Sequence, residues 1–474
     1  MTTSTRECHV MDIRSEQYSW EDIIGEEMKR FDPKNEEERR KKKSIYRIPA
    51  FLKLMKSSTV LTPLVVSFGP YHHDEENLKL LEGYKQMALL HFLHRNKKPL
   101  GHFMNAIKEV VEDLKAHYEF LEEKWNDEAE FIKLMMIDGC FMLEVLRFDS
   151  ESPETHHTAN DPIFSDHASQ HKLPYIKRDM LMLENQLPLL AIKVLIHAEK
   201  ADQRNSPMTD REINNKVFKF LKMEDMIDKT STLGLHILDL YRKGMIKTSI
   251  DDSTKSPQNK KEELLISNSQ GKGTDLDDHI HKTATIKGDA SMPTAMKLHE
   301  SGVRFKKSST DKINDICFDK GIFKLPHLII DDSTESIFLN LMAFEHLHVG
   351  LDDEVTSYVC FMDELSDSAI DVHRLCSDKI IHNAVGSDQV AAEILNSLTK
   401  EVIHDPTRKF GEIRTKVKEY SERRFNKWLA SLLHIYFQTP WTTIGLIAAV
   451  VLLILTFVQT FYAVAAYHFP EKPT

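Results

Sequence analysis

The chain has 474 residues, of which 41% are hydrophobic and 28% are charged, and its formal net charge is −11. This is the composition of an ordinary globular protein. It excludes a collagen, a wholly disordered chain, a polytopic membrane protein and a nucleic-acid binder that relies on bulk positive charge. The chain contains only 16 glycines, which favours a helix-rich fold over a turn-rich β-sandwich.

The N-terminal region is expected to pass from a charged leader into an ordered domain. Residues 1–44 are polar and end in the run EEERRKKKS, which predicts a disordered leader. Order is expected from residue 45. Residues 61–73 then read as extended, because Val65 and Val66 favour a strand that the following Gly-Pro pair would stop.

Helical spacing of apolar residues predicts four helices before residue 249. The third is apolar nearly all round and should be the most buried, and Pro188 should kink or restart the fourth. Residues 149–172 read as a loop. The predicted helices cover residues 77–93, 103–121, 130–148 and 177–197.

The second half of the chain follows a polar segment, residues 250–288, whose composition predicts a disordered insertion. Apolar clusters in residues 302–331 predict a small antiparallel β element. The fold class is therefore mainly α with a small antiparallel β element. Further helices are expected at residues 334–345, 354–365, 369–382, 388–402 and 410–437.

The C-terminus carries a long uncharged segment, residues 442–467. Its apolar part, residues 444–466, would form about 35 Å of helix at about 1.5 Å per residue, enough to cross a hydrocarbon core of about 30 Å. Trp441 and Tyr467 would stand near the two interfaces. This predicts one transmembrane helix that contacts the lipid bilayer.

The charges around this segment predict its orientation. Basic residues dominate the preceding flank, and the positive-inside rule then places the large N-terminal region in the cytoplasm. The N-terminus has no apolar signal-peptide core, so we expect a tail-anchored protein of the plasma membrane or an endomembrane. The basic flank could also lie against an anionic leaflet; it consists of Arg408, Lys409, Arg414, Lys416, Lys418, Arg423, Arg424 and Lys427.

Together these patterns divide the chain into a leader, two halves of one helical domain separated by the insertion, a membrane helix and a short tail. The predicted boundaries are residues 1–44, 45–249, 250–288, 289–438, 439–467 and 468–474.

Motifs for catalysis, cofactors and metals are not found in the sequence. There is no GxSxG, HRD, DFG or GxGxxG pattern, and histidine pairs such as His91 and His94 lack the HExxH arrangement. The five cysteines are odd in number and include no CxxC pair, which predicts reduced thiols rather than disulfides or a zinc ribbon. We therefore expect no cofactor, no metal and no nucleic-acid partner.

One group of polar residues is expected to be buried. Glu184, Asn185 and Gln186 interrupt an apolar segment just before Pro188. Since buried polar groups need partners, we expect them to satisfy backbone groups and to bind a neighbouring segment, for example at Arg47 or Tyr71. The alternative is an acid–base site in a pocket, formed by Glu184 with His72 and His73.

Several blocks of the chain resemble the plant DUF247 (UPF0481) family. The resemblance covers roughly residues 45 to 466, and the LENQ-P and GPYHH blocks are the most distinctive. It implies a plant membrane protein with a C-terminal span and no assigned enzymatic activity. Some relatives look like pollen-side determinants of self-incompatibility in grasses, which suggests recognition or signalling. The blocks are RIPAFLK, LTPLVVSFGPYHH, MIDGCFMLEVL, DMLMLENQLPLL, FDKGIFKLPHLIIDDSTESIFLNLMAFEH, YVCFMDELSDSAIDVHRL and the apolar tail.

The sequence thus predicts a membrane-anchored recognition or signalling protein that acts through protein partners and is not an enzyme. Two alternatives stay open, a membrane-associated enzyme and a passive membrane scaffold. The oligomeric state does not follow from the sequence.

Overall fold

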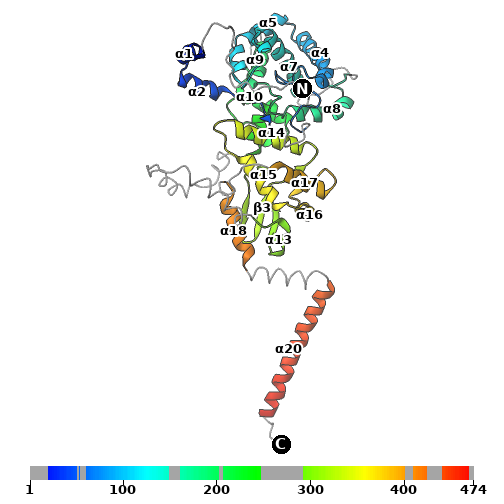
Figure 1. Ribbon diagram of the computed structural model, residues 1–474. Helices are drawn as coiled ribbons and strands as arrows, with labels where there is room; N and C mark the ends of the chain where they lie inside the picture. The colour runs from blue at the N-terminus through cyan, green and yellow to red at the C-terminus, as the bar shows by residue number, and fades with distance from the viewer. Residues whose placement is uncertain are drawn as a thin grey trace.

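The computed structural model describes residues 20–50, 53, 60–148, 161–201, 207–246, 292–400, 409–423 and 440–468. Figure 1 shows a helical body from which the C-terminal helix α20 stands apart. The insertion predicted at residues 250–288 lies outside the described residues. The mainly helical class is confirmed.

The first half of the body is built from helices around α7 (Glu128–Phe148). This is the helix that the sequence predicts as the most buried, and it packs against α4, α5 and α9. Its neighbours along the chain are α4 (Lys79–Asn96), α5 (Leu100–Lys108), α6 (Val111–Ala116), α8 (Asp166–Asp179), α9 (Leu189–Lys200), α10 (Asp210–Phe220) and α11 (Ile237–Met245), with short 3-10 turns η2 (Glu76–Leu78), η3 (Glu123–Asn126) and η5 (Glu224–Met226) between them.

Part of the predicted disordered leader differs from expectation. Residues 20–42 form two helices, α1 (Trp20–Arg30) and α2 (Pro33–Lys42). The second begins at an Asp32 cap whose side chain accepts a hydrogen bond from the Lys34 N–H, at 3.0 Å. Ion pairs one turn apart, Glu36 with Arg40 and Glu37 with Lys41, support a helix that has no apolar face.

Three boundaries in this half correct the sequence prediction. The helix expected at residues 177–197 is wrong between 180 and 188, where turns replace it, and helix α9 restarts directly after Pro188. The helix expected at 103–121 is divided into α5 and α6. The loop expected at 149–172 gives way to α8 at Asp166, and its residues 149–160 lie outside the described part of the chain.

The second half combines helices with two small sheets. The helices are α13 (Ala295–Glu300), α14 (Thr334–Leu347), α15 (Glu354–Leu365), α16 (Ala369–Ser377), α17 (Asp388–Thr399) and α18 (Gly411–Glu422), and the strands are β1 (Arg304–Lys307), β2 (Cys317–Asp319), β3 (Ile322–Leu325), β4 (Leu328–Ile330) and β5 (Ile381–Asn383).

The β element is confirmed, but its pairing is mixed rather than antiparallel. Among the strands that the structure describes, only β2 and β3 are antiparallel, because a tight turn at Lys320 and Gly321, both with positive φ, joins them. Strand β1 pairs with β3 in parallel. Strand β5 follows α16, where a longer helix is predicted, and it pairs in parallel with β4. Such parallel pairs need a long crossover.

Buried contacts join the two halves into one body. Arg242 on α11 donates to Glu345 on α14, with 2.8 Å between Nε and Oε1. The side-chain oxygen of Asn340 on α14 accepts a hydrogen bond from the Leu183 N–H, at 2.8 Å. The apolar core is one continuous cluster that includes side chains from both halves.

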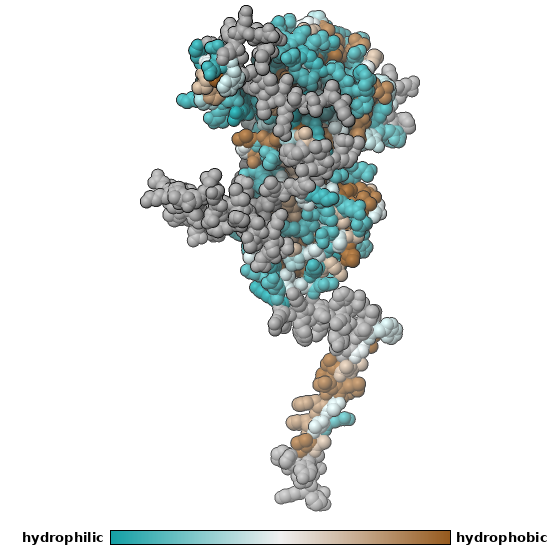
Figure 2. All heavy atoms as spheres, in the orientation of Figure 1, coloured by the Kyte–Doolittle hydropathy of each residue, from teal (hydrophilic) through white to brown (hydrophobic). Residues whose placement is uncertain are grey.

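Helix α20 (Pro440–His468) has the opposite character. Its segment Ile447–Val464 is long and apolar enough to cross a membrane, and none of it is buried against the body. The helix accordingly stands out as a brown, apolar rod in Figure 2. The predicted apolar C-terminal helix is therefore confirmed.

Candidate functional site

The predicted polar group lies in the interior, and Glu184 is fixed there by three neighbours. One carboxylate oxygen accepts from the Ile48 N–H at 2.6 Å, and the other accepts from the Lys53 ammonium at 2.7 Å. The His72 Nε2 atom lies 3.2 Å from that second oxygen. Burial alone would raise the pKa of Glu184, but His72 and Lys53 hold it below its usual value.

Asn185 and Gln186 bind backbone groups of other segments. Asn185 accepts from the Phe68 N–H at 2.7 Å and donates to the Val66 carbonyl at 3.0 Å. The Gln186 amide donates to the Met180 and Met182 carbonyls, which the broken helix leaves without helical donors. These contacts agree with the structural role that the sequence predicts for them.

Arg47 and Tyr71, the partners suggested for this group, bind elsewhere. The Arg47 guanidinium lies over the Tyr71 ring, 4.3 Å from its centroid, and pairs with Glu122. The Tyr71 hydroxyl donates to the Ile45 carbonyl at 3.3 Å. The sequence predicts that Glu184 binds the RIP or GPYHH block, but it does not show which atoms of those blocks are its partners. In the structure, the Ile48 N–H and the His72 ring take the places suggested for Arg47 and Tyr71.

His72 and His73 also lie apart from any cavity described below. The His72 Nδ1 atom is 2.6 Å from the Glu75 carboxylate, and the His73 ring packs edge-on against Trp125, with 5.5 Å between centroids. His72 and Glu184 do meet, as the enzyme alternative requires, but they meet in the packed interior.

Two buried carboxylates complete this polar core, and Asp179 was missed by the sequence argument. Its oxygens accept from the N–H groups of Leu64, Val65 and Val66 at 2.7 to 3.1 Å. Burial raises the pKa of Asp179, and the three N–H donors act against that rise. An acidic residue at the end of an apolar segment was the available signal.

Asp138 on α7 is the second carboxylate. It accepts from the Gly69 N–H at 2.8 Å and from the Lys85 ammonium at 2.8 Å. Both ionic side chains are fully buried. Gly69 has φ +73°, and a Cβ there would stand 2.7 Å from the Gln186 carbonyl oxygen, so only glycine fits.

Two residues of the predicted basic flank form ion pairs with the body. Lys409 pairs with Asp352 and Glu354, and Arg414 is buried against Glu364 at 3.0 Å. These two residues hold α18 to the body. Lys416, Lys418 and Arg423 lie on α18 or directly after it, and Arg408, Arg424 and Lys427 lie outside the described residues.

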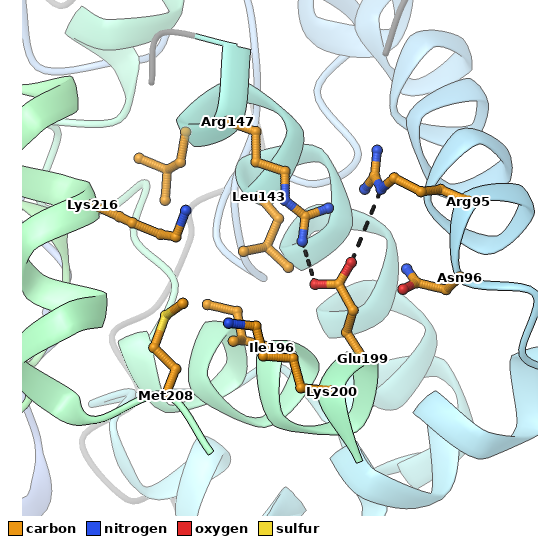
Figure 3. A pocket seen from close by; sticks show the side chains of 10 residues that line it. Arg95, Asn96, Leu143, Arg147, Ile196, Glu199, Lys200, Met208 and Lys216 are labelled. Atoms are coloured by element: carbon orange, nitrogen blue, oxygen red, sulfur yellow. Dashed lines mark hydrogen bonds and ion pairs between the residues drawn. The ribbon is translucent and has the colours of Figure 1, made fainter. Parts of the chain in front are cut away.

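A cavity of about 340 Å³ opens between α4, α7 and α9. Figure 3 shows Glu199 placed between the guanidinium groups of Arg95 and Arg147. Both arginines also pair with the buried carboxylate of Glu144. Two arginines and two glutamates thus neutralise one another, which makes this ring a link between helices more than a ligand site.

A larger cavity of about 720 Å³ lies between the two halves of the body, and it is the better candidate. Four carboxylates and two ammonium groups line it, so the lining carries an excess of negative charge. The charged lining residues are Lys222, Glu224, Asp225, Asp311, Lys312 and Asp331.

Three polar groups in this cavity have hydrogen-bonding capacity left. Asp331 uses its Oδ1 atom to accept from Ser333 and Thr334, while its Oδ2 atom accepts no bond from the described residues. Tyr241 and His327 also line the cavity without a hydrogen bond to the described chain. Burial, together with Asp331, raises the pKa of Tyr241 to about 12, so its hydroxyl stays a donor.

Strand β4 borders the same cavity with an open edge. Leu328 donates to the Ile380 carbonyl and Ile330 accepts from the Ala384 N–H, so these two residues face β5. Backbone groups alternate along a strand, and the N–H and C=O groups of His327 and Ile329 therefore face away from β5. Neither residue makes a backbone hydrogen bond within the described chain, and Ile329 is 53% exposed.

Metal ligands do not converge in the part of the chain that the structure describes, where no group of three or more His, Cys, Asp or Glu side chains could hold an ion. Cys140, Cys317, Cys360 and Cys376 are free thiols.

Comparison with known proteins places the chain in a family. The model of DUF247, described as a plant protein of unknown function, matches residues 45–455. A UPF0481 protein of Arabidopsis thaliana is 28% identical over 437 residues, which cover 89% of this chain and 86% of the relative. A second UPF0481 protein of the same plant is 30% identical over 175 residues, 36% of this chain and 33% of that relative. No solved structure matches. The chain therefore belongs to the DUF247 (UPF0481) family of plant proteins.

Proposed function

We propose that this protein is a membrane-anchored recognition protein that binds extended segments of partner proteins and is not an enzyme. The observation that carries the proposal is the open edge of β4 beside the acidic cavity. An extended peptide adds to such an edge through backbone hydrogen bonds, and neighbouring pockets then select its side chains. The excess of carboxylates favours a peptide with a lysine or arginine.

Anchoring is the second part of the proposal. The exposed apolar surface of α20 supports insertion into a bilayer. The basic residues before it support an orientation with the body in the cytoplasm. Deleting residues 442–474 should release the body from membranes; continued association after carbonate washing would show that another segment anchors the chain. Protease protection of a tag at each terminus in sealed vesicles tests the orientation.

The proposed peptide-binding edge can be tested by removing one backbone N–H group. Ile329→Pro removes the outward N–H and leaves the bonds of Leu328 and Ile330 to β5 in place. Ile329→Val keeps that N–H and is the matched control. A random-peptide phage library selected on the detergent-solubilised full chain should enrich basic, extended peptides. Their affinity should fall at least about tenfold in Ile329→Pro, as expected for the loss of a hydrogen bond worth about 1.5 kcal/mol.

Equal binding by both variants would exclude the edge of β4 as the site. Enrichment of peptides without basic residues would contradict the role of the carboxylates. Asp331→Asn tests that role directly, because it removes one negative charge and keeps an oxygen for the Ser333 and Thr334 contacts.

A further inference from the structure

Helix α4 presents an apolar stripe to solvent on the face opposite its packed side. Leu80, Met87 and Leu90 are 76%, 52% and 58% exposed. Gly83 lies on the same line, and a Cβ placed there would contact nothing within 4 Å. Apolar atoms show at this end of the body in Figure 2. Large side chains so exposed at regular spacing indicate a contact surface.

The spacing of the stripe is that of a helix–helix seam. From Leu80 the steps to Gly83, Met87 and Leu90 are three, four and three residues, as at the a and d positions of a heptad. The packed side of the same helix includes Lys85 and Phe92, both fully buried towards α7. One face of α4 therefore holds the body together, and the other has the pattern of a second helical interface.

We propose that this stripe is the interface between two copies of the chain, which pair through antiparallel α4 helices around a two-fold axis. A two-fold interface must be complementary to itself, and the stripe meets this condition in one register, with the axis next to residue 85. In that register Leu80 of each copy lies against Leu90 of the other. Gly83 lies opposite Met87, so a large side chain fills the space that the glycine leaves open.

The polar residues at the two ends of α4 fit the same register. Glu76, in the turn η2 directly before the helix, falls level with His94 of the second copy, where its carboxylate can accept a hydrogen bond from the imidazole. Glu76 also pairs with Lys79 of its own chain, whereas His94 makes no such pair in the described chain. The helix dipoles also oppose each other favourably in this arrangement. The proposed dimer uses a different surface from the peptide edge of β4 and does not depend on it.

Cysteine cross-linking tests the antiparallel register directly. Full chains that carry Leu80→Cys and Leu90→Cys, with different tags, are co-expressed, oxidised in membranes and separated without reductant. A disulfide between the two variants is expected. Leu80→Cys alone should not form one, because its two copies would lie about 15 Å apart along the helices, beyond the roughly 7 Å that a disulfide spans between Cα atoms. Chains without the new cysteines control for the exposed thiol of Cys317.

Disruption of the stripe gives an independent test by light scattering of the full chain in detergent. The wild type should be a dimer, and Met87→Glu with Leu90→Glu should be a monomer with unchanged circular dichroism. Ile370→Glu, at a 64% exposed apolar residue of α16, is the control and should remain a dimer. His94→Glu should weaken the dimer about tenfold, since it places two pairs of carboxylates next to each other across the interface, and Glu76→Lys added to it should restore the dimer.

Three results would overturn the proposal. They are a monomeric wild type, a dimer that persists in the doubly substituted variant, for instance through α20, and a disulfide between two Leu80→Cys chains, which would indicate parallel helices. If the doubly substituted variant does not fold, the cross-linking experiment still decides between these outcomes.

Discussion

The backbone hydrogen bonds of two segments differ in this protein. Residues 64–69 form no strand, because the chain bends at Leu64 and Val65, and buried side chains accept hydrogen bonds from their N–H groups. Asp179 accepts from three of these groups, and Asn185 and Asp138 each accept from one more. Strand β4 has a regular partner on one side, but on the other side the backbone groups of His327 and Ile329 make no hydrogen bond to the residues that the structure describes.

This difference distinguishes polar groups that stabilise the fold from polar groups that can bind a ligand. A buried N–H with an acceptor stabilises the fold, and removing the acceptor is costly. An unpaired N–H at the border of a cavity contributes little to folding but can bind a ligand. The family blocks around residues 61–73 and 179–190 are therefore best explained by folding, and the candidate site lies elsewhere. The predictions below test this division.

The largest effect is expected for Asp179→Ala. The substitution leaves the buried Val66 N–H and the part-buried N–H groups of Leu64 and Val65 without their acceptor, and it removes the carboxylate that pairs with the buried Arg178 guanidinium. The free energy of unfolding, measured with urea on the detergent-solubilised chain, should fall by about 4 kcal/mol or more, and the variant could fail to accumulate. Asp332→Ala, at an exposed position, is the control and should be nearly neutral. A loss below about 1 kcal/mol would mean that water replaces the carboxylate.

Breaking the buried ion pair comes next. Lys85→Met removes the cation that pairs with both Asp138 and Glu82. The Asp138 carboxylate then stays buried with the Gly69 N–H as its remaining donor, and such a change typically costs about 3–5 kcal/mol. Adding Asp138→Asn should recover part of the loss, because the amide oxygen can still accept from the Gly69 N–H while no charge is stranded. If the double substitution is less stable than the single one, the stranded charge is not the cause. Urea unfolding of both variants decides.

Local sequence patterns predict the helices and strands of this fold better than they predict the contacts between them. The helix expected at residues 354–365 coincides with α15, because its apolar residues repeat at helical spacing. Polar residues in an apolar segment likewise predict that Glu184 binds backbone. Its partner Ile48 is 136 residues away, and no local pattern specifies such a distance. The parallel pairing of β4 with β5 could not be predicted from the sequence for the same reason.

The candidate site could not be predicted for a different physical reason. Tyr241 comes from the first half and lies outside the family blocks, whereas Asp331 comes from the second half and lies within the block at residues 318–346, which carries no known catalytic motif. What marks them is a hydrogen-bonding capacity that the fold leaves unused beside a cavity, and this is a property of three-dimensional packing. The sequence predicts a structural role for Glu184 and keeps an acid–base site with His72 and His73 as the alternative, and His72 and Glu184 lie in the packed interior.

An effect of pH on stability, of intermediate size, is expected from His236, a buried side chain that hydrogen-bonds within the fold. Its Nε2 atom lies 3.0 Å from the Ser44 carbonyl, and its Nδ1 atom accepts from the Asp239 N–H at 3.2 Å. Burial lowers the pKa of His236 to about 4. The unfolded chain, with an ordinary pKa near 6.5, then binds the proton first as pH falls. Stability should be constant above about pH 6.5 and fall by up to about 3 kcal/mol towards pH 4.

Urea unfolding between pH 7.5 and 4.5 measures this slope. His236→Asn keeps a side-chain acceptor for the Asp239 N–H but does not titrate, so its slope should be smaller. Burial also lowers the pKa of His117, His327 and His348, and these residues contribute to a remaining slope. An unchanged slope in His236→Asn would show that His236 does not cause the effect.

The smallest effect on stability is expected for Ile329→Pro, which is compared with a proline placed in the segment of residues 64–69. Val65→Pro removes an N–H that donates to Asp179 at 2.7 Å, and it should cost about 2–3 kcal/mol because the carboxylate loses a buried partner. Ile329→Pro removes an N–H that has no partner among the described residues, so its free energy of unfolding should change by less than about 1 kcal/mol. Equal losses in the two variants would show that the edge of β4 is structurally occupied, and the peptide site would then have to be sought elsewhere. If Ile329→Pro is as stable as the wild type but no longer binds the selected peptides, the N–H of Ile329 is needed for binding and not for folding.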